Sequence, residues 1–317
     1  MPHALRTFLR TNPVTGRLVT WGWQHYLTAL AEAAPGDCDP VPKVPGAGRT
    51  FADPDGTAYH LMHNGLKVVA NGYYDATFSE VIRVLRGHHE PQEERVFHEV
   101  LPALPDAPCM IEAGGYWAYY SMWLKLARPR ARVVVVEPID SHRAVGEANV
   151  ALNGMTAEFV RAAVGEASRP PADVSLEGVR VPALEQVCVD DVMARFDLPF
   201  VHVLHADVQG AELEMLGGAA GALAGKRVGY VFLSTHGDRL HARCRDYLTV
   251  HGYGVVAEHT RRESFTTDGL IVAKAPGFPG PDRVPISRNT RRSSPAVLLG
   301  YALGRLGLLR RPTRDSA

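Results

Sequence analysis

The stretch "MIEAGGYWAYYSMWL", residues 110–124, is the most informative part of the sequence for the fold. A short apolar run ends in an acid, Glu112, and Gly114 and Gly115 follow it. A strand, a glycine turn and a helix in this order form the first unit of a nucleotide-binding α/β sheet. A turn that holds a pyrophosphate on bare helix amides excludes large residues, yet Tyr116 and Trp117 stand here. The turn therefore favours a nucleotide ligand that has no pyrophosphate.

The sequence around this turn alternates between short apolar runs and amphipathic stretches. Strands separated by helices of 10–15 residues form βαβ units and a parallel sheet. We therefore predict an α/β fold, with a helix after each of the first five strands. The predicted strands span residues 109–114, 132–138, 157–165, 200–208, 227–236, 254–259 and 269–275.

Composition excludes several classes of protein. The 317 residues include 34 Lys plus Arg and 34 Asp plus Glu, so the formal net charge is zero. The chain as a whole therefore has no excess positive charge that would attract nucleic acid. The four cysteines are scattered without a CxxC spacing, which indicates reduced thiols in a cytoplasmic protein. The first residues lack the apolar core of a signal peptide, and no run is long enough to span a bilayer.

The sequence pattern divides the chain into three segments. Residues 1–85 are predicted to be an extension with helical parts and a β-hairpin at Asn64-Gly65, serving acceptor or oligomer contacts. Residues 86–278 form the α/β domain. Residues 279–317 form a tail whose stretch 296–311 has the spacing of a basic amphipathic helix. Such a helix docks on its own protein or on a partner subunit, or lies on an anionic membrane.

Glu137 is the strongest candidate for contact with a nucleotide. It ends the second strand, 25 residues after Glu112. A carboxylate at this place accepts both ribose hydroxyl protons of an adenosine. S-adenosylmethionine combines an adenosine with a sulfonium and has no pyrophosphate. The aromatic faces of Tyr116 and Trp117 would favour the sulfonium cation, unless Trp117 serves to pack the helix onto the sheet.

Three titratable residues end the next strands and are candidate catalytic groups. His205 and Asp207 are two residues apart and so point to the same face of a strand, and His236 ends the following strand. Three interpretations stay open: a base with its orienting carboxylate, a divalent metal site, or local hydrogen bonding. A base or a positioning role for the acceptor is favoured over a metal, and Asp207 is the strongest candidate.

Several ordered motifs resemble one family. "IEAGGYWAYYS" resembles the acid-x-Gly-Ala-Asn-x-Gly-Tyr-Tyr-Ser motif of FkbM-type methyltransferases, and "HADVQGAELEML" is similar to that family's Asp-Val-(Glu/Gln)-Gly-Ala-Glu segment. "EPQEERVF", "FLSTHG" and "TTDGLIVA" fit one branch of it. Tyr116 stands where the family often has Asn, and Ala118 where it usually has Gly.

The resemblance covers about residues 55–276 and implies a class I methyltransferase fold. This Rossmann-like fold has a seven-stranded, mostly parallel sheet whose last strand is antiparallel. The resemblance also implies that Glu112, Gly114, Ser121 and Glu137 surround the cofactor. The residues expected to bind the cofactor are Glu90, Glu112, Gly114, Gly115, Tyr116, Ser121, Glu137, Pro138, Ala163 and Asp207.

The expected function is methylation by S-adenosylmethionine of a hydroxyl on a sugar or natural product. The partners expected are a small-molecule or glycan acceptor and a second copy of the chain. N-methylation of a peptide amide or amine is the alternative reaction. A nucleotide-binding protein without turnover is the alternative from another class, and a dehydrogenase is a weaker one because the GxGxxG turn is missing.

Overall fold

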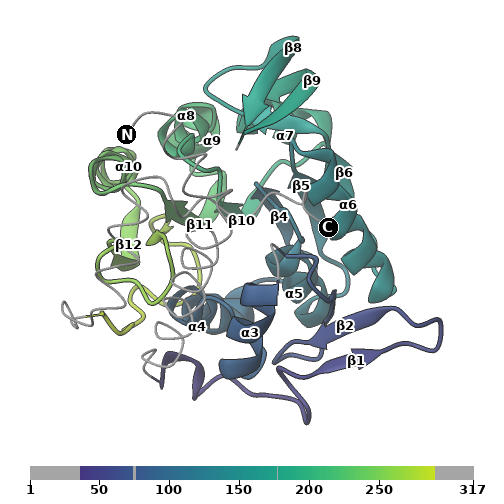
Figure 1. The fold of residues 1–317 in the computed structure, drawn as a ribbon. Helices are drawn as coiled ribbons and strands as arrows, with labels where there is room; N and C mark the ends of the chain where they lie inside the picture. Colours follow the sequence, from purple (N-terminus) through teal and green to yellow (C-terminus); the bar gives the residue numbers. More distant parts are fainter. Residues whose placement is uncertain (1–35, 74–75, 177, 290–317) are drawn as a thin grey trace, which may run out of the picture.

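We describe the protein from a computed structural model, which covers residues 36–73, 76–176 and 178–289. A central sheet lies between two layers of helices (Figure 1). The strand order is β12 (Gly254–His259), β13 (Gly269–Lys274), β11 (Val228–Thr235), β10 (Val201–Ala206), β4 (Cys109–Ala113), β5 (Arg132–Val136) and β6 (Glu158–Val160). β13 runs antiparallel to both of its neighbours, and the pairings from β11 to β6 are parallel. The predicted sheet with an antiparallel last strand is therefore confirmed.

The central strands are buried on both faces, which explains their nearly continuous apolar sequence. Consecutive residues of β10 alternate between two cores: Val203 packs in one and Leu204 in the other. The first core includes side chains of α4 (Pro91–Val100), α5 (Tyr119–Ala127) and α6 (Asp140–Leu152). The second includes side chains of α7 (Val189–Arg195), α8 (Glu212–Gly217), α9 (Ala220–Ala224) and α10 (Asp238–Val250).

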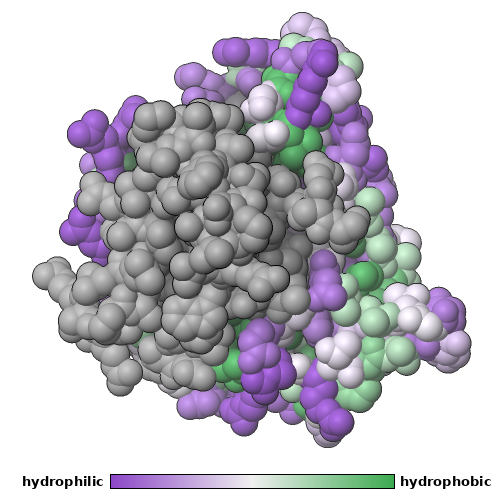
Figure 2. Space-filling view, in the orientation of Figure 1, coloured by the Kyte–Doolittle hydropathy of each residue, from purple (hydrophilic) through white to green (hydrophobic). Residues whose placement is uncertain are grey.

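A second sheet follows β6. The prediction of one strand over 157–165 is wrong, because the chain leaves the main sheet at Arg161. Its guanidinium contacts Asp140 at 2.8 Å and donates to the carbonyl oxygens of Pro182 and Ala183. β7 (Ala162–Val164) then pairs with β9 (Val179–Val187), and β9 pairs with β8 (Arg169–Leu176). The β8–β9 ribbon extends away from the main sheet (Figure 1), and apolar residues gather beside it (Figure 2).

The hairpin predicted at Asn64-Gly65 joins β2 (Ala58–Leu61) to β3 (Lys67–Val69). Gly65 has φ +90°, and the Asn64 side chain accepts the N–H of Leu66 at 3.1 Å. β1 (Thr50–Ala52) adds a third strand, and α3 (Ala76–Val84) and two short 3-10 turns, η1 (Gly36–Cys38) and η2 (Leu101–Ala103), complete the described elements. Asn149 on α6 and Asn153, directly after it, accept N–H groups of β3, so this sheet is docked on the domain.

The chain after β13 stays attached to the domain as far as residue 289. Val284 is 4% exposed and its N–H donates to Val256. Ser287 donates to Asp37, and its carbonyl accepts the Gln92 side chain. The amphipathic helix predicted within 296–311 and the helical part predicted before residue 36 lie outside the described residues. Within the described residues, no helix has the length and apolarity needed to cross a bilayer.

These contacts predict how far the C-terminus can be shortened without loss of stability. A chain ending at residue 289 should keep the melting temperature and cofactor affinity of the full chain. A chain ending at residue 280 should be about 2–4 kcal/mol less stable, because it loses a buried valine and several hydrogen bonds. Denaturant unfolding of both truncations measures the difference. Equal stability of the two would show that residues 281–289 contribute nothing to the fold.

Candidate functional site

A cavity of about 440 Å³ opens at the carboxyl ends of β4, β5 and β10. Ligands of open α/β sheets bind at this edge, and pockets for small ligands usually measure about 300–1,000 Å³. Most of the predicted site residues line it. They are Glu90, Glu112, Gly114, Gly115, Tyr116, Glu137, Pro138, Ala163, His205 and Asp207. Ser121 and His236 are not among the described residues that line the cavity.

The glycine turn brings two strand ends into close contact. Gly114 has φ +72°, and a Cβ at this position would lie 1.9 Å from the carbonyl oxygen of Asp207. A Cβ on Gly115 would lie 2.3 Å from Val135. Tyr116 and Ala118 have φ values of +34° and +57°, in or near the left-handed region that Asn and Gly adopt most readily. The turn therefore keeps the backbone path that the family's Asn and Gly favour, with other side chains.

Glu137 anchors the floor of the cavity. Its carboxylate accepts the N–H of Tyr116 at 3.1 Å and the N–H of Ile139 at 2.9 Å. A carboxylate has about four acceptor positions, so capacity remains for two more donors. The Tyr116 ring stacks on His142 with centroids 3.8 Å apart, next to Glu137. This end of the cavity therefore combines a buried carboxylate with aromatic faces.

Trp117 both packs the helix and faces the cavity. It is 5% exposed and stacks on Tyr73 with centroids 4.2 Å apart. The His89 ring meets its face edge-on at 4.7 Å. The two roles that the sequence left open for Trp117, packing and ligand contact, are therefore compatible.

Glu112 and Ser121 lie where β4 meets α5. Glu112 lines the cavity and accepts the backbone N–H of Ser121 at 3.0 Å. Burial raises the pKa of Glu112, against the opposing effect of His205. The Ser121 side chain is fully buried, so its contact with the cavity lining is the backbone hydrogen bond to Glu112.

His205 points toward α4 and α5. Its Nε2 lies 2.8 Å from Glu93, and its ring packs on Tyr120. Burial opposes the imidazolium, but the adjacent Glu93 carboxylate raises the pKa of His205. His205 lines the same cavity as Asp207, and its ion-pair partner is Glu93.

His236 lies beyond the cavity wall and contacts three carboxylates. Its Nδ1 is 2.7 Å from Glu212, and its Nε2 is 3.3 Å from Asp207 and 3.4 Å from Asp268. Burial opposes the charge, but the carboxylates raise the pKa of His236 to about 10. His236 is thus an imidazolium at neutral pH. A protonated ring has no free lone pair, so Asp207 is favoured over His236 as the base.

Asp207 is the group of this cluster that faces the cavity. Burial and the nearby Asp268 raise its pKa to about 8, against the opposing effect of His236. Its side chain also accepts the Gln209 amide at 2.8 Å. Within the described residues, His205, Asp207 and His236 do not converge as a group of metal ligands.

Several lining residues were not predicted from the sequence. The β8–β9 ribbon contributes Val174, Ser175, Leu176 and Gln186 to the wall, and α6 contributes His142. His142 follows Glu137 by five residues, so the position of that strand end could have indicated it. The ribbon had no comparable signal, since Pro170 and Pro171 argue against a strand.

The strand order and the cavity define a class I methyltransferase fold. Residues 105–255 match the family model described as the methyltransferase FkbM domain. This part of the chain therefore matches an FkbM methyltransferase domain, which supports S-adenosylmethionine-dependent methyl transfer as the activity. The resemblance inferred from the motifs at residues 110–121 and 205–216 is confirmed. No curated protein matches the chain.

Solved structures similar to the chain are remote. Precorrin-6y C5,15-methyltransferase of Geobacter metallireducens is 16% identical over 57% of this chain and 87% of that one, with a TM-score of 0.38. The methyltransferase domain of METTL16 is 11% identical over 78% of this chain and 91% of that one, with a TM-score of 0.44. M. capricolum TrmK, solved with S-adenosyl-homocysteine, is 10% identical over 58% of this chain and 69% of that one, with a TM-score of 0.37. The assignment therefore rests on the matched domain and the strand order.

Proposed function

We propose that the protein methylates a hydroxyl group of a sugar or natural product, with Asp207 as the general base. The observation that carries this proposal is the position of Asp207, a carboxylate in the cavity wall beside the His236 imidazolium. An alcohol is a poor nucleophile until its proton is removed, so a positioned base is the group that O-methylation requires. Glu212 hydrogen-bonds Nδ1 of His236 and thereby orients the imidazole ring.

The cavity residues fit S-adenosylmethionine. The free acceptor positions of Glu137 suit two ribose hydroxyls, and the aromatic faces of Tyr116 and Trp117 suit a sulfonium. Glu112 and Glu90 would attract the ammonium of the amino-acid tail. When bound, the cofactor supplies an electrophilic methyl group. The protein would then hold the acceptor oxygen in line with that methyl and take up its proton on Asp207.

Mass spectrometry of metabolites from cells with and without the gene tests the proposal. We expect one compound to lose a methyl group on deletion and to regain it when the wild-type chain is restored. A chain with Asp207→Asn should not restore it. Fragmentation locates the methyl group: a methyl on oxygen supports the proposal, and one on an amide or amine nitrogen contradicts it.

The pH dependence of kcat/KM should reflect this pair of residues. Asp207 must lose its proton to act as a base, so kcat/KM should rise as the pH increases through about 8. It should fall again as His236 loses its proton near pH 10. The groups that face Asp207 are His236, Asp268, Glu90 and His205. The rate should change about tenfold per pH unit well below the lower pKa.

The variant His236→Gln provides the control for this assignment. Without the imidazolium, the carboxylate of Asp207 loses a stabilising charge, so the lower limb of the profile should move to higher pH. The upper limb should disappear. An unchanged profile in this variant would remove His236 from the site, and a profile without a limb near pH 8 would remove Asp207 as the base.

A further inference from the structure

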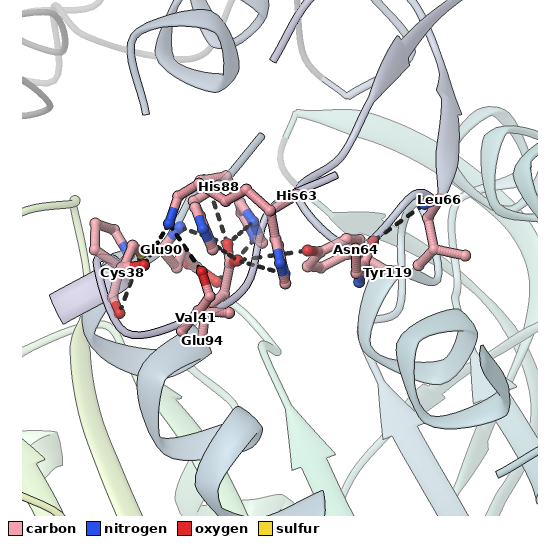
Figure 3. A network of polar contacts seen from close by, with 12 residues as sticks. Cys38, Val41, His63, Asn64, Leu66, His88, Glu90, Glu94 and Tyr119 are labelled. Carbon is pink, nitrogen blue, oxygen red and sulfur yellow. Dashed lines mark hydrogen bonds and ion pairs between the residues drawn. The ribbon is translucent and has the colours of Figure 1, made fainter. Parts of the chain in front are cut away.

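A second cluster of buried ionisable groups lies outside the cavity, where the β2–β3 hairpin meets the start of α4 (Figure 3). It contains His63 from the hairpin, His88 from the segment before α4, and Glu94 from α4. The three side chains are at most 2% exposed. One potential ligand atom from each residue lies within 4.8 Å of the other two. The proposed methyl transfer uses none of these groups.

Close backbone contact holds the cluster together. Gly87 has φ +90°, and its carbonyl accepts the N–H of His63 at 3.0 Å. A Cβ on Gly87 would lie 2.3 Å from that same nitrogen, so a larger residue would separate the two segments. As a result, the rings of His63 and His88 stack with centroids 4.0 Å apart. The chain thus brings two imidazoles from distant parts of the sequence to one point.

The hydrogen bonds of His63 leave a lone pair directed at a carboxylate. Its Nδ1 lies 3.2 Å from the carbonyl oxygen of Pro42, which can only accept, so Nδ1 carries the hydrogen. Nε2 has no hydrogen-bond partner among the described residues and lies 3.5 Å from Glu94 Oε2. That distance is too long for a normal hydrogen bond. A buried lone pair facing a carboxylate oxygen is favourable when a cation lies between them.

The same oxygen is the target of His88. Its Nδ1 hydrogen-bonds Glu94 Oε2 at 2.5 Å, a contact that a bound ion would replace by taking the place of the proton, whereas Oε1 accepts the backbone N–H groups of His89 and Glu90. Two imidazole nitrogens therefore converge on the one carboxylate oxygen that no backbone amide occupies. The Tyr119 hydroxyl, 3.4 Å from Oε2, is a further oxygen at this point.

We propose that His63 Nε2, His88 Nδ1 and Glu94 Oε2 bind a divalent transition-metal ion, with Zn²⁺ the best fit. Two histidines and a carboxylate are a common ligand set for zinc. A ligating histidine usually donates its other N–H to a backbone carbonyl, as His63 does to Pro42. The ion would connect the N-terminal sheet to the methyltransferase domain, one turn from Glu90 in the cavity wall. The proposed role of the ion is structural, because all three side chains are buried and the Tyr119 hydroxyl is a further oxygen at this point.

His60 offers a matched comparison within the same hairpin. It is also buried, but each ring nitrogen has a hydroxyl partner: Thr50 at 3.0 Å and Ser79 at 2.8 Å. Its polar atoms are satisfied without a cation. Loss of His60 should therefore affect packing and leave metal binding unchanged.

The experiment titrates Zn²⁺ alone into the full chain, purified on a tag without histidine and treated with a chelator. We expect one tightly bound ion per chain and a higher melting temperature. The variant His63→Gln should weaken Zn²⁺ binding at least ~100-fold, more than the loss of a supporting hydrogen bond usually does. His60→Gln should bind as the wild type does. Equal Zn²⁺ binding by the wild type and His63→Gln, or equal losses in both variants, would overturn the proposal.

A second variant keeps the test decisive if His63→Gln does not fold. In His63→Cys a thiolate replaces the imidazole, and Co²⁺ in place of Zn²⁺ should then show a thiolate-to-cobalt absorption band that the wild type lacks. Absence of this band in folded His63→Cys would contradict the site. These readouts are metal content and absorption, so they are independent of the acceptor and of methyl transfer.

Discussion

Replacing Asp207 by asparagine should reduce turnover by about 10²–10⁴-fold, the usual contribution of general base catalysis. The amide has nearly the same shape but cannot take up the acceptor's proton. Affinity for S-adenosylmethionine should change little, because the proposed cofactor contacts come from Glu137 after β5 and the aromatic residues between β4 and α5, whereas Asp207 follows β10. Single-turnover rates and calorimetry on the same preparation separate the two effects.

Asp268→Asn is the matched control for Asp207→Asn. Asp268 lies as close to His236 as Asp207 does, at 3.4 and 3.3 Å. If the carboxylates matter only by holding the imidazolium, the two variants should lose similar activity. If Asp207 acts on the acceptor, Asp268→Asn should retain much more. Wild-type turnover in Asp207→Asn would refute the assignment and leave Asp207 a structural role at the end of β10.

Replacing Glu137 by glutamine should weaken binding of S-adenosylmethionine by about 1–3 kcal/mol, the cost of leaving buried donors unpaired. The glutamine oxygen can still accept one backbone N–H, so the fold should persist. The remaining amide nitrogen would face the ribose hydroxyls as a donor. Calorimetry measures the affinity, and the melting temperature without ligand shows whether the turn is intact.

Glu147→Gln is a suitable comparison for Glu137→Gln. Glu147 lies on α6 and pairs with Arg143 at the surface. Exposed pairs of this kind contribute little to stability, so this variant should bind the cofactor as the wild type does. Unchanged affinity in Glu137→Gln would remove Glu137 from the cofactor site.

The main sheet was predictable because its signals are local. Runs such as residues 132–136 are β-branched and too short for a helix, and they recur between amphipathic stretches. Asn64-Gly65 predicted a hairpin because both residues tolerate positive φ, and in the structure Gly65 is the residue of this pair that adopts it. The order of the strands in the sheet cannot be read from any single segment of the sequence. It was predicted from the family resemblance at residues 110–121 and 205–216.

The β8–β9 ribbon was not predictable by the same reasoning. Its first strand contains Pro170 and Pro171, which remove two backbone donors. The structure accommodates them because β8 is the outer strand of its small sheet, where donors need no partner. The break at Arg161 was also hidden, since its neighbours are apolar and its partners, Asp140 and the ribbon carbonyls, are distant in sequence.

The candidate site was predictable in position and less so in chemistry. Strand ends located Glu112, Glu137, His205 and Asp207 at one edge of the sheet, and the structure places all four in the cavity wall. The protonation of His236 could not be inferred, because it depends on three carboxylates that come from different loops and helices. The cluster at His63 was not recognised, because its ligands come from a hairpin, a loop and a helix.

The cavity that Glu137 and Asp207 line is the proposed cofactor site. Calorimetric titration of the full chain and of Glu137→Gln with S-adenosylmethionine, and separately with NAD, tests it most directly. We expect one S-adenosylmethionine per wild-type chain, weaker binding to Glu137→Gln, and no heat from NAD. Binding of NAD alone, or equal affinity of both chains for S-adenosylmethionine, would contradict the account.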